Sequence, residues 1–181
     1  MICRTKHDKD LCFPSFYLAE QGMSVCGTYK YLGHFMSEKM EDDDDIFRQR
    51  RALYAQANML KRRFHYCSNA VKVNLFRAYC TPLYTAPLWA KCKKTSMAKL
   101  QAAYNDCLRI LLRQPRWCSA SELFCTSGVS SFHALLQTLM YKFMCRLHVT
   151  KNTVVKVLVD PSASDTRYKS ALWNHLYSSL L

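Results

Sequence analysis

Four consecutive aspartates, Asp42 to Asp45, are the residues of this sequence best suited to chemistry. Two-metal enzymes hold their ions with clustered carboxylates, about 4 Å separating the ions, so a metal site is the first reading to weigh. Such carboxylates come from rigid, separated backbone positions, whereas adjacent residues opening a helix point in different directions. We therefore interpret the run as the cap and first turn of a helix, where carboxylates meet free N–H groups and the positive end of the dipole. The sequence predicts no catalytic residue and no metal ligand.

Histidines and cysteines offer no alternative chemistry. The sequence has no glycine-rich phosphate loop, no nucleophile elbow, no CxxC motif and no histidine pair at metal-ligand spacing. We interpret the ten cysteines as thiols that mostly serve as small buried apolar residues. The first ten residues, MICRTKHDKD, are charged and resemble no signal segment, so we expect an intracellular protein of the cytoplasm or nucleus. No apolar run approaches the length of about 20 residues that a membrane span needs.

Positive charge is unevenly distributed along the chain. The net charge is +13, and nineteen lysines and arginines lie between Ile46 and Val159 against two acidic residues, Asp106 and Glu122. So few carboxylates cannot pair so many cations, and a polyanionic partner is the natural interpretation. The alternative is a solvated basic surface with no partner. A membrane surface is less favoured, because the arginines are spread over several expected helices.

The elements that position these charges begin with a β region at residues 11–36. β-branched and aromatic residues flank a turn signal at Glu20, Gln21 and Gly22, which predicts a hairpin followed by one more strand. Two or three strands cannot bury both faces alone, so we expect that a preceding segment is missing. Half of the 181 residues are apolar and only four are glycine, which favours a folded, mainly helical body of one domain or a closely packed pair.

A long helix is predicted from Asp42, where the apolar period changes to 3.6 residues. Its buried stripe is Ile46, Leu53, Ala57, Leu60 and Phe64. Off this stripe stand the cations Arg48, Arg51, Lys61, Arg62 and Arg63.

Two more helices are expected before residue 115. The first follows Ser68 or Asn69, with Lys72 and Arg77 on its polar side and an apolar face of Val71, Leu75, Phe76, Tyr79 and Cys80. The second is capped by Thr95 or Ser96 and ends before Pro115, with an inner face of Met97, Leu100, Tyr104, Cys107, Leu108 and Leu111. In the connection between them, Tyr84 and Trp89 are expected to pack in the core.

The remaining chain is predicted to form a short turn capped by Ser119 or Ser121, then a helix from about Ser131 that packs lengthwise on the earlier helices. We therefore expect a β region over residues 1–40, a bundle of three to four helices over 41–149 and a weakly defined tail over 150–181. In that tail residues 152–160 fit either a strand or a helix, and a short helix contains Leu172, Trp173 and Leu176.

Five blocks in order carry a resemblance to a known family. They are YKYLGHFM, IFRQRRALYAQANMLKRRF, LFRAYCTPLYTAPLW, LQAAYNDCLRILLRQPRWCSASELF and YKFMCRL, within Phe13 to Leu147. Their order, with an acid-rich spacer between the first block and the second, resembles the segment that follows the palm in reverse transcriptases of LINE-type (non-LTR) retrotransposons. The resemblance implies a primer-grip-like remnant of the palm in residues 1–40 and a thumb-like domain in residues 41–149 that holds an RNA or RNA–DNA duplex.

The resemblance also implies roles for named residues. Lys30, Tyr31, Leu32 and Gly33 match the primer-grip motif, in which Gly33 permits close approach of the backbone to a neighbour or ligand. For Tyr31 and Leu32 a plain strand core is an equal alternative. The residues expected to contact phosphates are Arg48, Arg51, Lys61, Arg62, Arg63, Lys72 and Arg77.

The chain departs from the family where activity depends on it. It contains no Tyr-x-Asp-Asp or Phe-x-Asp-Asp turn, and neither the fingers nor the palm. We therefore expect no polymerisation and no cofactor in this chain, Mg²⁺ being expected only in the full-length polymerase. Three hypotheses remain: an inactive fragment of the polymerase, a basic helical nucleic-acid-binding module retained by its host, or a structural remnant without a ligand.

Overall fold

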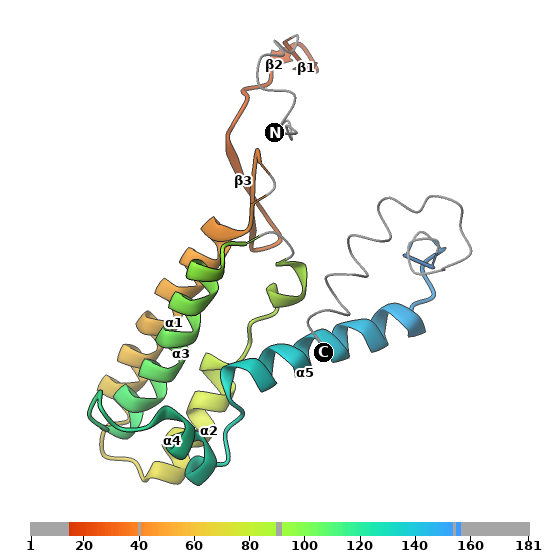
Figure 1. Ribbon diagram of the computed structural model, residues 1–181. Helices are drawn as coiled ribbons and strands as arrows, with labels where there is room; N and C mark the ends of the chain where they lie inside the picture. The colour runs from red at the N-terminus through yellow and green to blue at the C-terminus, as the bar shows by residue number, and fades with distance from the viewer. Residues whose placement is uncertain (1–14, 40, 90–91, 154, 157–181) are drawn as a thin grey trace.

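The computed structural model describes residues 15–39, 41–89, 92–153 and 155–156, and these form two small antiparallel sheets followed by a helical bundle (Figure 1). The predicted mainly helical fold with an N-terminal antiparallel β region is confirmed. The strands are β1 (Tyr17–Leu18), β2 (Gln21–Gly22), β3 (Thr28–Tyr31) and β4 (His34–Ser37). The helices are α1 (Asp43–Arg63), α2 (Asn69–Cys80), the 3₁₀ helix η1 (Ala86–Leu88), α3 (Lys94–Leu112), α4 (Ala120–Ser127) and α5 (Phe132–Val149).

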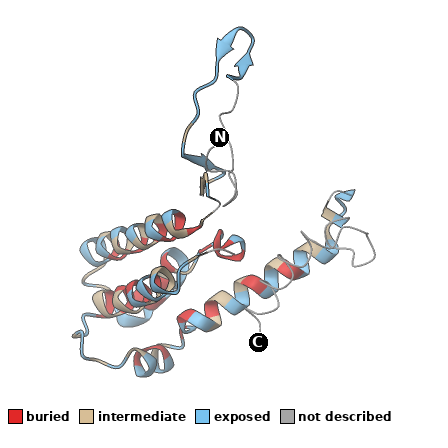
Figure 2. Cartoon of the chain, turned by 45° about the horizontal axis from the view of Figure 1, so that its top comes forward, coloured by how far each residue is buried: buried red, intermediate tan, exposed pale blue. Residues whose placement is uncertain are grey.

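The β region consists of two separate hairpins, which corrects the predicted hairpin plus single strand. In each, two residues with positive φ join the strands: Ala19 and Glu20 at 48° and 68°, and Leu32 and Gly33 at 47° and 83°. Such two-residue turns match the right-handed twist of paired strands. Gln21 and Gly22 therefore lie in β2, and the turn is formed by Ala19 and Glu20 instead of by residues 20–22 as predicted. The β1–β2 hairpin projects away from the bundle and is exposed (Figure 2).

Helices α1 and α3 lie side by side and run in the same direction (Figure 1). At their N-terminal ends the Lys93 amide donates to Asp43 Oδ1 at 3.2 Å, and further along the Tyr54 hydroxyl donates to Asp106 Oδ2 at 3.2 Å. The predicted α1 stripe is confirmed by the burial of Ile46, Leu53, Ala57 and Leu60, with Phe64 partly buried. The predicted inner face of α3 is confirmed at Leu100, Tyr104, Cys107, Leu108 and Leu111, with Met97 partly buried.

Tyr104 occupies the centre of the core. Its ring centroid lies 5.2 Å from that of Phe76, 5.4 Å from that of Phe124 and 5.7 Å from that of Phe132, which joins residues of α2, α4 and α5 to α3. Its hydroxyl donates to the Ser130 carbonyl at 3.0 Å, so the one polar atom of this ring is satisfied. Burial raises the pKa of Tyr104.

Serine caps three helices at the predicted starts, although a capping role was predicted only at Ser119 or Ser121. Ser68, Ser119 and Ser131 accept hydrogen bonds from the amides of Val71, Glu122 and Ala134. The prediction that Thr95 or Ser96 caps α3 is wrong, because α3 begins at Lys94, after Lys93 at the cap position. The Lys93 amide is bound by Asp43 of α1, so a residue distant in sequence fixes this helix start.

The orientation of α2 and the connection after it differ from the prediction. Val71 and Tyr79 are exposed, whereas Lys72, predicted on the polar side, is buried. Apolar residues surround most of this helix, so their spacing fits two adjacent faces, and packing against α1 and α3 selects the face of Lys72, Val73, Phe76 and Cys80. In the connection Trp89 is buried as predicted, but Tyr84 is exposed.

Helix α5 leaves the bundle instead of packing lengthwise on it as predicted (Figure 1). Phe132 and Leu135 belong to the main core, while Met140 and Met144 form a separate buried cluster with Phe143 and Leu147. A periodic apolar stripe predicts a helix with a buried side, but it does not identify the element that covers that side. Most of the predicted tail, including Leu172, Trp173 and Leu176, lies outside the described residues.

The described residues test two predictions made from composition, one on the cysteines and one on membrane spans. The eight described cysteines are free thiols, but only Cys80 and Cys107 are buried, and Cys125 and Cys145 are exposed, so the expectation of mostly buried cysteines is wrong. Burial raises the pKa of Cys80 to about 12 and also raises that of Cys107. No helix in the described part of the chain combines the length and apolarity that crossing a membrane requires.

Candidate nucleic-acid interface

The junction between the β3–β4 hairpin and α1 is organised by the buried carboxylate of Asp45. Oδ2 accepts the Trp89 indole N–H at 2.9 Å and lies 3.2 Å from His34 Nδ1. Oδ1 accepts two hydrogen bonds from Arg48, at 2.8 and 2.9 Å, and one from the Phe35 amide at 3.4 Å. Asp45 therefore joins the hairpin, α1 and the segment after η1, and the prediction that all four aspartates serve only as cap and dipole charges is wrong at this residue.

The partners of Asp45 favour its charged form. Burial alone would raise the pKa of this carboxyl, but hydrogen bonds from Trp89 and Arg48, the nearby Thr85 hydroxyl and the Arg48 charge together lower it below the ordinary value of 3.8. The Thr85 hydroxyl oxygen is itself buried, and no hydrogen-bond partner is found for it among the described residues. Among the other aspartates, Asp42 occupies the N-cap position of α1, but its side chain makes no capping hydrogen bond.

The predicted primer-grip residues form the tip of the β3–β4 hairpin. Tyr31 is 59% exposed and Leu32 is 81% exposed, so the alternative that they form a strand core is wrong. Gly33 has a φ of 83°, and a Cβ at this position would collide with the Tyr84 hydroxyl. That hydroxyl donates to the Leu32 carbonyl at 3.4 Å. The expected close approach at Gly33 is confirmed, and the neighbour that approaches is Tyr84.

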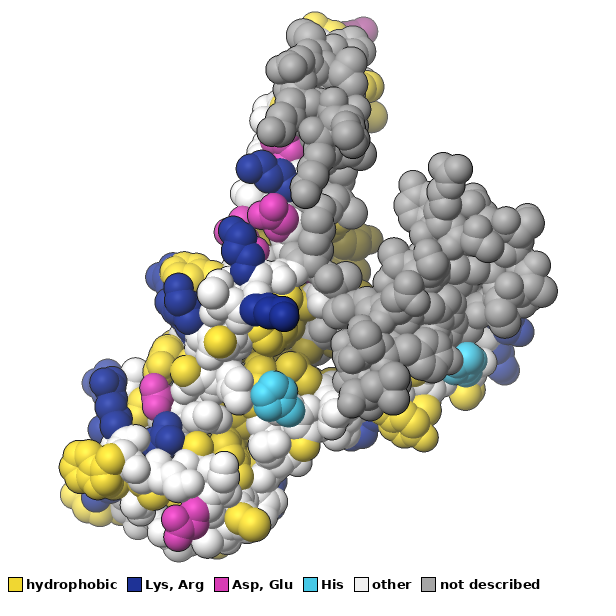
Figure 3. All heavy atoms as spheres, in the orientation of Figure 1, with side chains coloured by type: hydrophobic (Ala, Val, Ile, Leu, Met, Phe, Trp, Pro, Cys, Tyr) yellow, Lys and Arg dark blue, Asp and Glu magenta, His cyan; other side chains and the backbone are white. Residues whose placement is uncertain are grey.

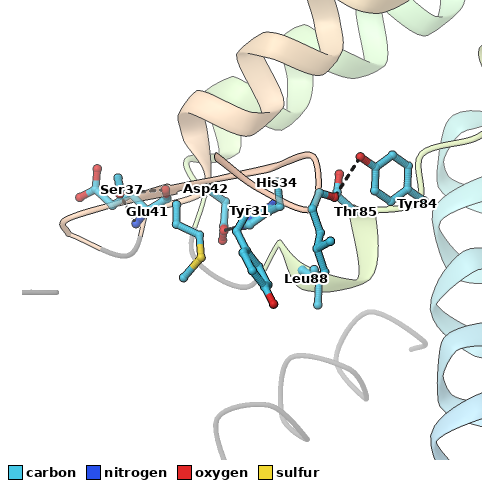
Figure 4. A pocket seen from close by; sticks show the side chains of 10 residues that line it. Tyr31, His34, Ser37, Glu41, Asp42, Tyr84, Thr85 and Leu88 are labelled. Atoms are coloured by element: carbon cyan, nitrogen blue, oxygen red, sulfur yellow. Dashed lines mark hydrogen bonds and ion pairs between the residues drawn. The ribbon is translucent and has the colours of Figure 1, made fainter. Parts of the chain in front are cut away.

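A hollow of about 500 Å³ lies between this hairpin tip and η1 (Figure 4). Its lining is largely apolar and includes Tyr31, Met36, Tyr84 and Leu88. Two carboxylates, those of Glu41 and Asp42, lie in its lining, and Asp42 Oδ1 lies 3.6 Å from His34 Nε2. Among the described residues no group of three or more histidine, cysteine or acidic side chains is arranged to hold a metal ion.

The residues predicted to contact phosphates fall into two groups. Arg51, Lys61, Arg62 and Arg63 are exposed on α1. The other three have structural roles or positions: Arg48 binds Asp45, Lys72 is buried, and Arg77 Nη2 donates to the carbonyls of Ser127 and Gly128 at 3.3 and 2.6 Å. Arg77 thus closes the C-terminal end of α4. Only the first group is positioned for a partner.

Phe47 and Arg50 adjoin the exposed cations of α1, and the sequence analysis named neither residue. Phe47 is 51% exposed, and the guanidinium carbons of Arg50 and Arg51 lie 5.1 and 5.8 Å from the centroid of its ring. An aromatic ring at this distance attracts a cation and restricts its position. Residues three and four apart on a helix are neighbours, so the spacing of Phe47, Arg50 and Arg51 is a signal that could have identified this group.

A chain of hydrogen bonds links α1 to the loop after α3. Tyr54 binds Asp106, Asp106 Oδ1 accepts from Arg109 Nη1 at 3.0 Å, and Arg109 Nε donates to the Cys118 carbonyl at 3.0 Å. Burial and the Asp106 carboxylate raise the pKa of Tyr54. The loop that carries Arg113 and Arg116 is therefore fastened to α3, next to α1.

We define the basic surface as the exposed cations on α1 and on the loop after α3. Its members are Arg51, Lys61, Arg62, Arg63, Arg113 and Arg116. Lys and Arg side chains lie over this part of the molecule, whereas most Asp and Glu side chains in view lie beside the hairpin (Figure 3). None of the six makes an ion pair with a carboxylate of the described residues. Such an array can bind the phosphate groups of a nucleic acid, and this binding does not depend on the base sequence.

Comparison with known proteins adds no family to this description. No protein-family model matches the chain, and searches of curated proteins and of solved structures gave no match. The functional argument depends on the chain itself.

Proposed function

We propose that the chain is the thumb segment of a LINE-type reverse transcriptase and that its basic surface binds the backbone of an RNA or RNA–DNA duplex. The proposal is supported by the order of the five sequence blocks and by a helical bundle following an antiparallel β region. The observation that carries it is the set of exposed cations on α1, because they have no carboxylate partner among the described residues.

In this proposal the chain binds but does not polymerise. Its most conspicuous carboxylate, Asp45, is fully buried and is committed to Trp89, Arg48 and the hairpin. Catalytic aspartates and the Mg²⁺ that they bind would belong to a palm outside this sequence.

The binding claim can be tested by measuring duplex affinity as a function of salt concentration. Each phosphate contact that a protein makes adds about 0.9 to the slope of log K against log salt for a B-form duplex, and we expect a similar effect for an RNA–DNA hybrid. Changing Arg51, Lys61, Arg62 and Arg63 together to glutamine should lower the affinity and flatten that slope. Fluorescence anisotropy with a labelled hybrid duplex measures both quantities.

The matched control removes the same charge from another part of the chain. Lys142, Arg146, Lys151 and Lys156 are exposed on and after α5, away from the basic surface. Changing these four to glutamine should leave the slope close to that of the unaltered protein. Equal losses of duplex affinity in both variants would show a general effect of net charge and contradict a defined interface. If the unaltered protein bound no duplex, the proposal itself would be wrong.

A further inference from the structure

Two aromatic side chains stand almost fully exposed at one end of the basic surface. Tyr66, in the turn between α1 and α2, is 92% exposed, and Trp117, in the loop between α3 and α4, is 88% exposed. These are the highest exposures among the large apolar side chains of the described residues. Because α1 and α3 run in the same direction, the two segments lie at the same end of the bundle (Figure 1).

The segment that carries Trp117 is fixed to the bundle. The Cys118 amide donates to the Pro115 carbonyl at 3.1 Å, which closes a turn around Arg116 and Trp117, and the Cys118 carbonyl accepts from Arg109. Arg109 is in turn held by Asp106, which binds Tyr54 of α1. The loop is thus closed by a turn and fastened to α3 at Cys118, while the indole of Trp117 faces solvent.

Tyr66 is also held by local structure. The Cys67 amide donates to the Phe64 carbonyl at 3.2 Å, so the chain turns at His65 and Tyr66. The rings of these two residues lie with centroids 3.6 Å apart. A fixed aromatic ring loses little conformational entropy when a flat ligand stacks on it.

The charge around the two rings is positive. Arg62 and Arg63 precede Tyr66 by four and three residues, and Arg113 and Arg116 precede Trp117 by four residues and one. All four are exposed, and the carboxylate nearest in the network, Asp106, is neutralised by Arg109. An apolar protein partner would leave these cations without counter-charges, whereas a nucleic-acid strand supplies phosphates for the arginines and flat bases for the rings.

We propose that Tyr66 and Trp117 stack on unpaired bases, so that this end of the basic surface binds single-stranded nucleic acid. The inference rests on the proposed function, because the arginines that frame the rings belong to the same surface. It adds a second kind of ligand, which is single-stranded nucleic acid. The α1 cations contact the backbone of a duplex, and Tyr66 and Trp117 stack on bases of the unpaired strand that continues from it.

The test compares a single-stranded oligo(dT) with an RNA–DNA hybrid duplex of equal length, using the full chain. Stacking on an aromatic side chain is typically lost by substitution with alanine at a cost of about tenfold in affinity. Tyr66→Ala and Trp117→Ala should each weaken binding of oligo(dT) by about that factor while duplex affinity stays unchanged. The salt slope should also be unchanged, because no phosphate contact is removed. Trp117→Phe should retain most of the affinity.

Tyr141 provides a matched control, since it is 62% exposed on α5 and lies away from this end. Tyr141→Ala should leave oligo(dT) affinity unaltered. A spectroscopic readout is also available in a Trp173→Phe background, because Trp89 is buried and Trp117 then becomes the exposed tryptophan. Oligo(dT) should quench the Trp117 fluorescence at the concentrations at which it binds.

The possible results separate this inference from the proposed function. If the chain binds duplex but Tyr66→Ala and Trp117→Ala leave oligo(dT) affinity unchanged, the stacking site is wrong. The proposed function is then unaffected. Equal losses for both nucleic acids would also overturn it, because the rings would then not distinguish unpaired bases. If the unaltered chain bound neither nucleic acid, both proposals would fail together.

Discussion

The two ends of the α1–α3 pair use charged side chains in opposite ways. At the hairpin end the Asp45 carboxylate is bound by Arg48, by His34 and by the indole N–H of Trp89. At the other end Arg62, Arg63 and Arg116 are exposed without a carboxylate partner in the described part of the chain. The comparison shows that residue type alone does not indicate a binding role. The partners of a charge determine whether it serves the fold or remains available to a ligand.

The largest effect that would sharpen this comparison is expected from Asp45→Ala. This change leaves the Trp89 N–H and the Arg48 guanidinium without their buried acceptor, and breaking a buried pair in this way costs about 3 kcal/mol. Urea denaturation measures the loss in the free energy of unfolding. Asp44→Ala, at an exposed position in the same turn, is the control and should change it by less than about 0.5 kcal/mol. Equal effects of the two changes would contradict a structural role specific to Asp45.

A smaller effect is expected from Gly33→Ala at the hairpin tip. The positive φ disfavours any residue with a Cβ, and the new methyl would collide with Tyr84, so we expect a loss of about 1 to 2 kcal/mol. Gly27→Ala is the control, because a Cβ there would meet no atom within 4 Å. In a double-mutant cycle, Tyr84→Ala should recover the part of the loss that comes from the collision. Strict additivity of the two changes would show that Tyr84 does not restrict the tip.

The smallest expected effect is a pH dependence of stability at the hairpin end. The pKa of Asp45 is lower in the folded protein than its ordinary value of 3.8, so the folded state binds this proton less readily than the unfolded state. Its stabilising contribution is therefore complete above pH 3.8 and is lost as the pH falls through the folded-state pKa. Thermal unfolding below pH 3.8 should be less pH-dependent in Asp45→Asn than in the unaltered protein. Parallel pH profiles for the two proteins would refute the assignment.

Local pattern was sufficient to predict much of the fold. The α1 stripe, the inner face of α3 and the starts of α2, α4 and α5 near Ser68, Ser119 and Ser131 depend on residues close in sequence, and the structure confirms them. The face of α2 was mispredicted because Val71 and Tyr79 fit the same spacing as the residues that are buried. The start of α3 was missed because its cap interaction comes from Asp43, fifty residues earlier.

The candidate site was only partly predictable for the same reason. Arg51, Lys61, Arg62 and Arg63 lie exposed, as their positions off the apolar stripe of α1 predict. No local pattern indicates that Asp45 accepts a hydrogen bond from Trp89, 44 residues away, or that Arg77 donates to the carbonyls at the C-terminal end of α4. The sequence analysis did not predict that Trp117 is exposed next to a basic surface, because the position of its loop depends on the hydrogen bond from Arg109 to the Cys118 carbonyl.

The most direct test of the contrast between the two ends is a lysine acetylation footprint with and without an RNA–DNA hybrid duplex. Lys61 lies on the basic surface, and Lys93 lies at the hairpin end with its side chain 71% exposed. Mass spectrometry reports the acetylation of both lysines in the same sample. The account predicts that the duplex protects Lys61 and leaves Lys93 reactive. Protection of Lys93 with Lys61 still reactive would contradict it.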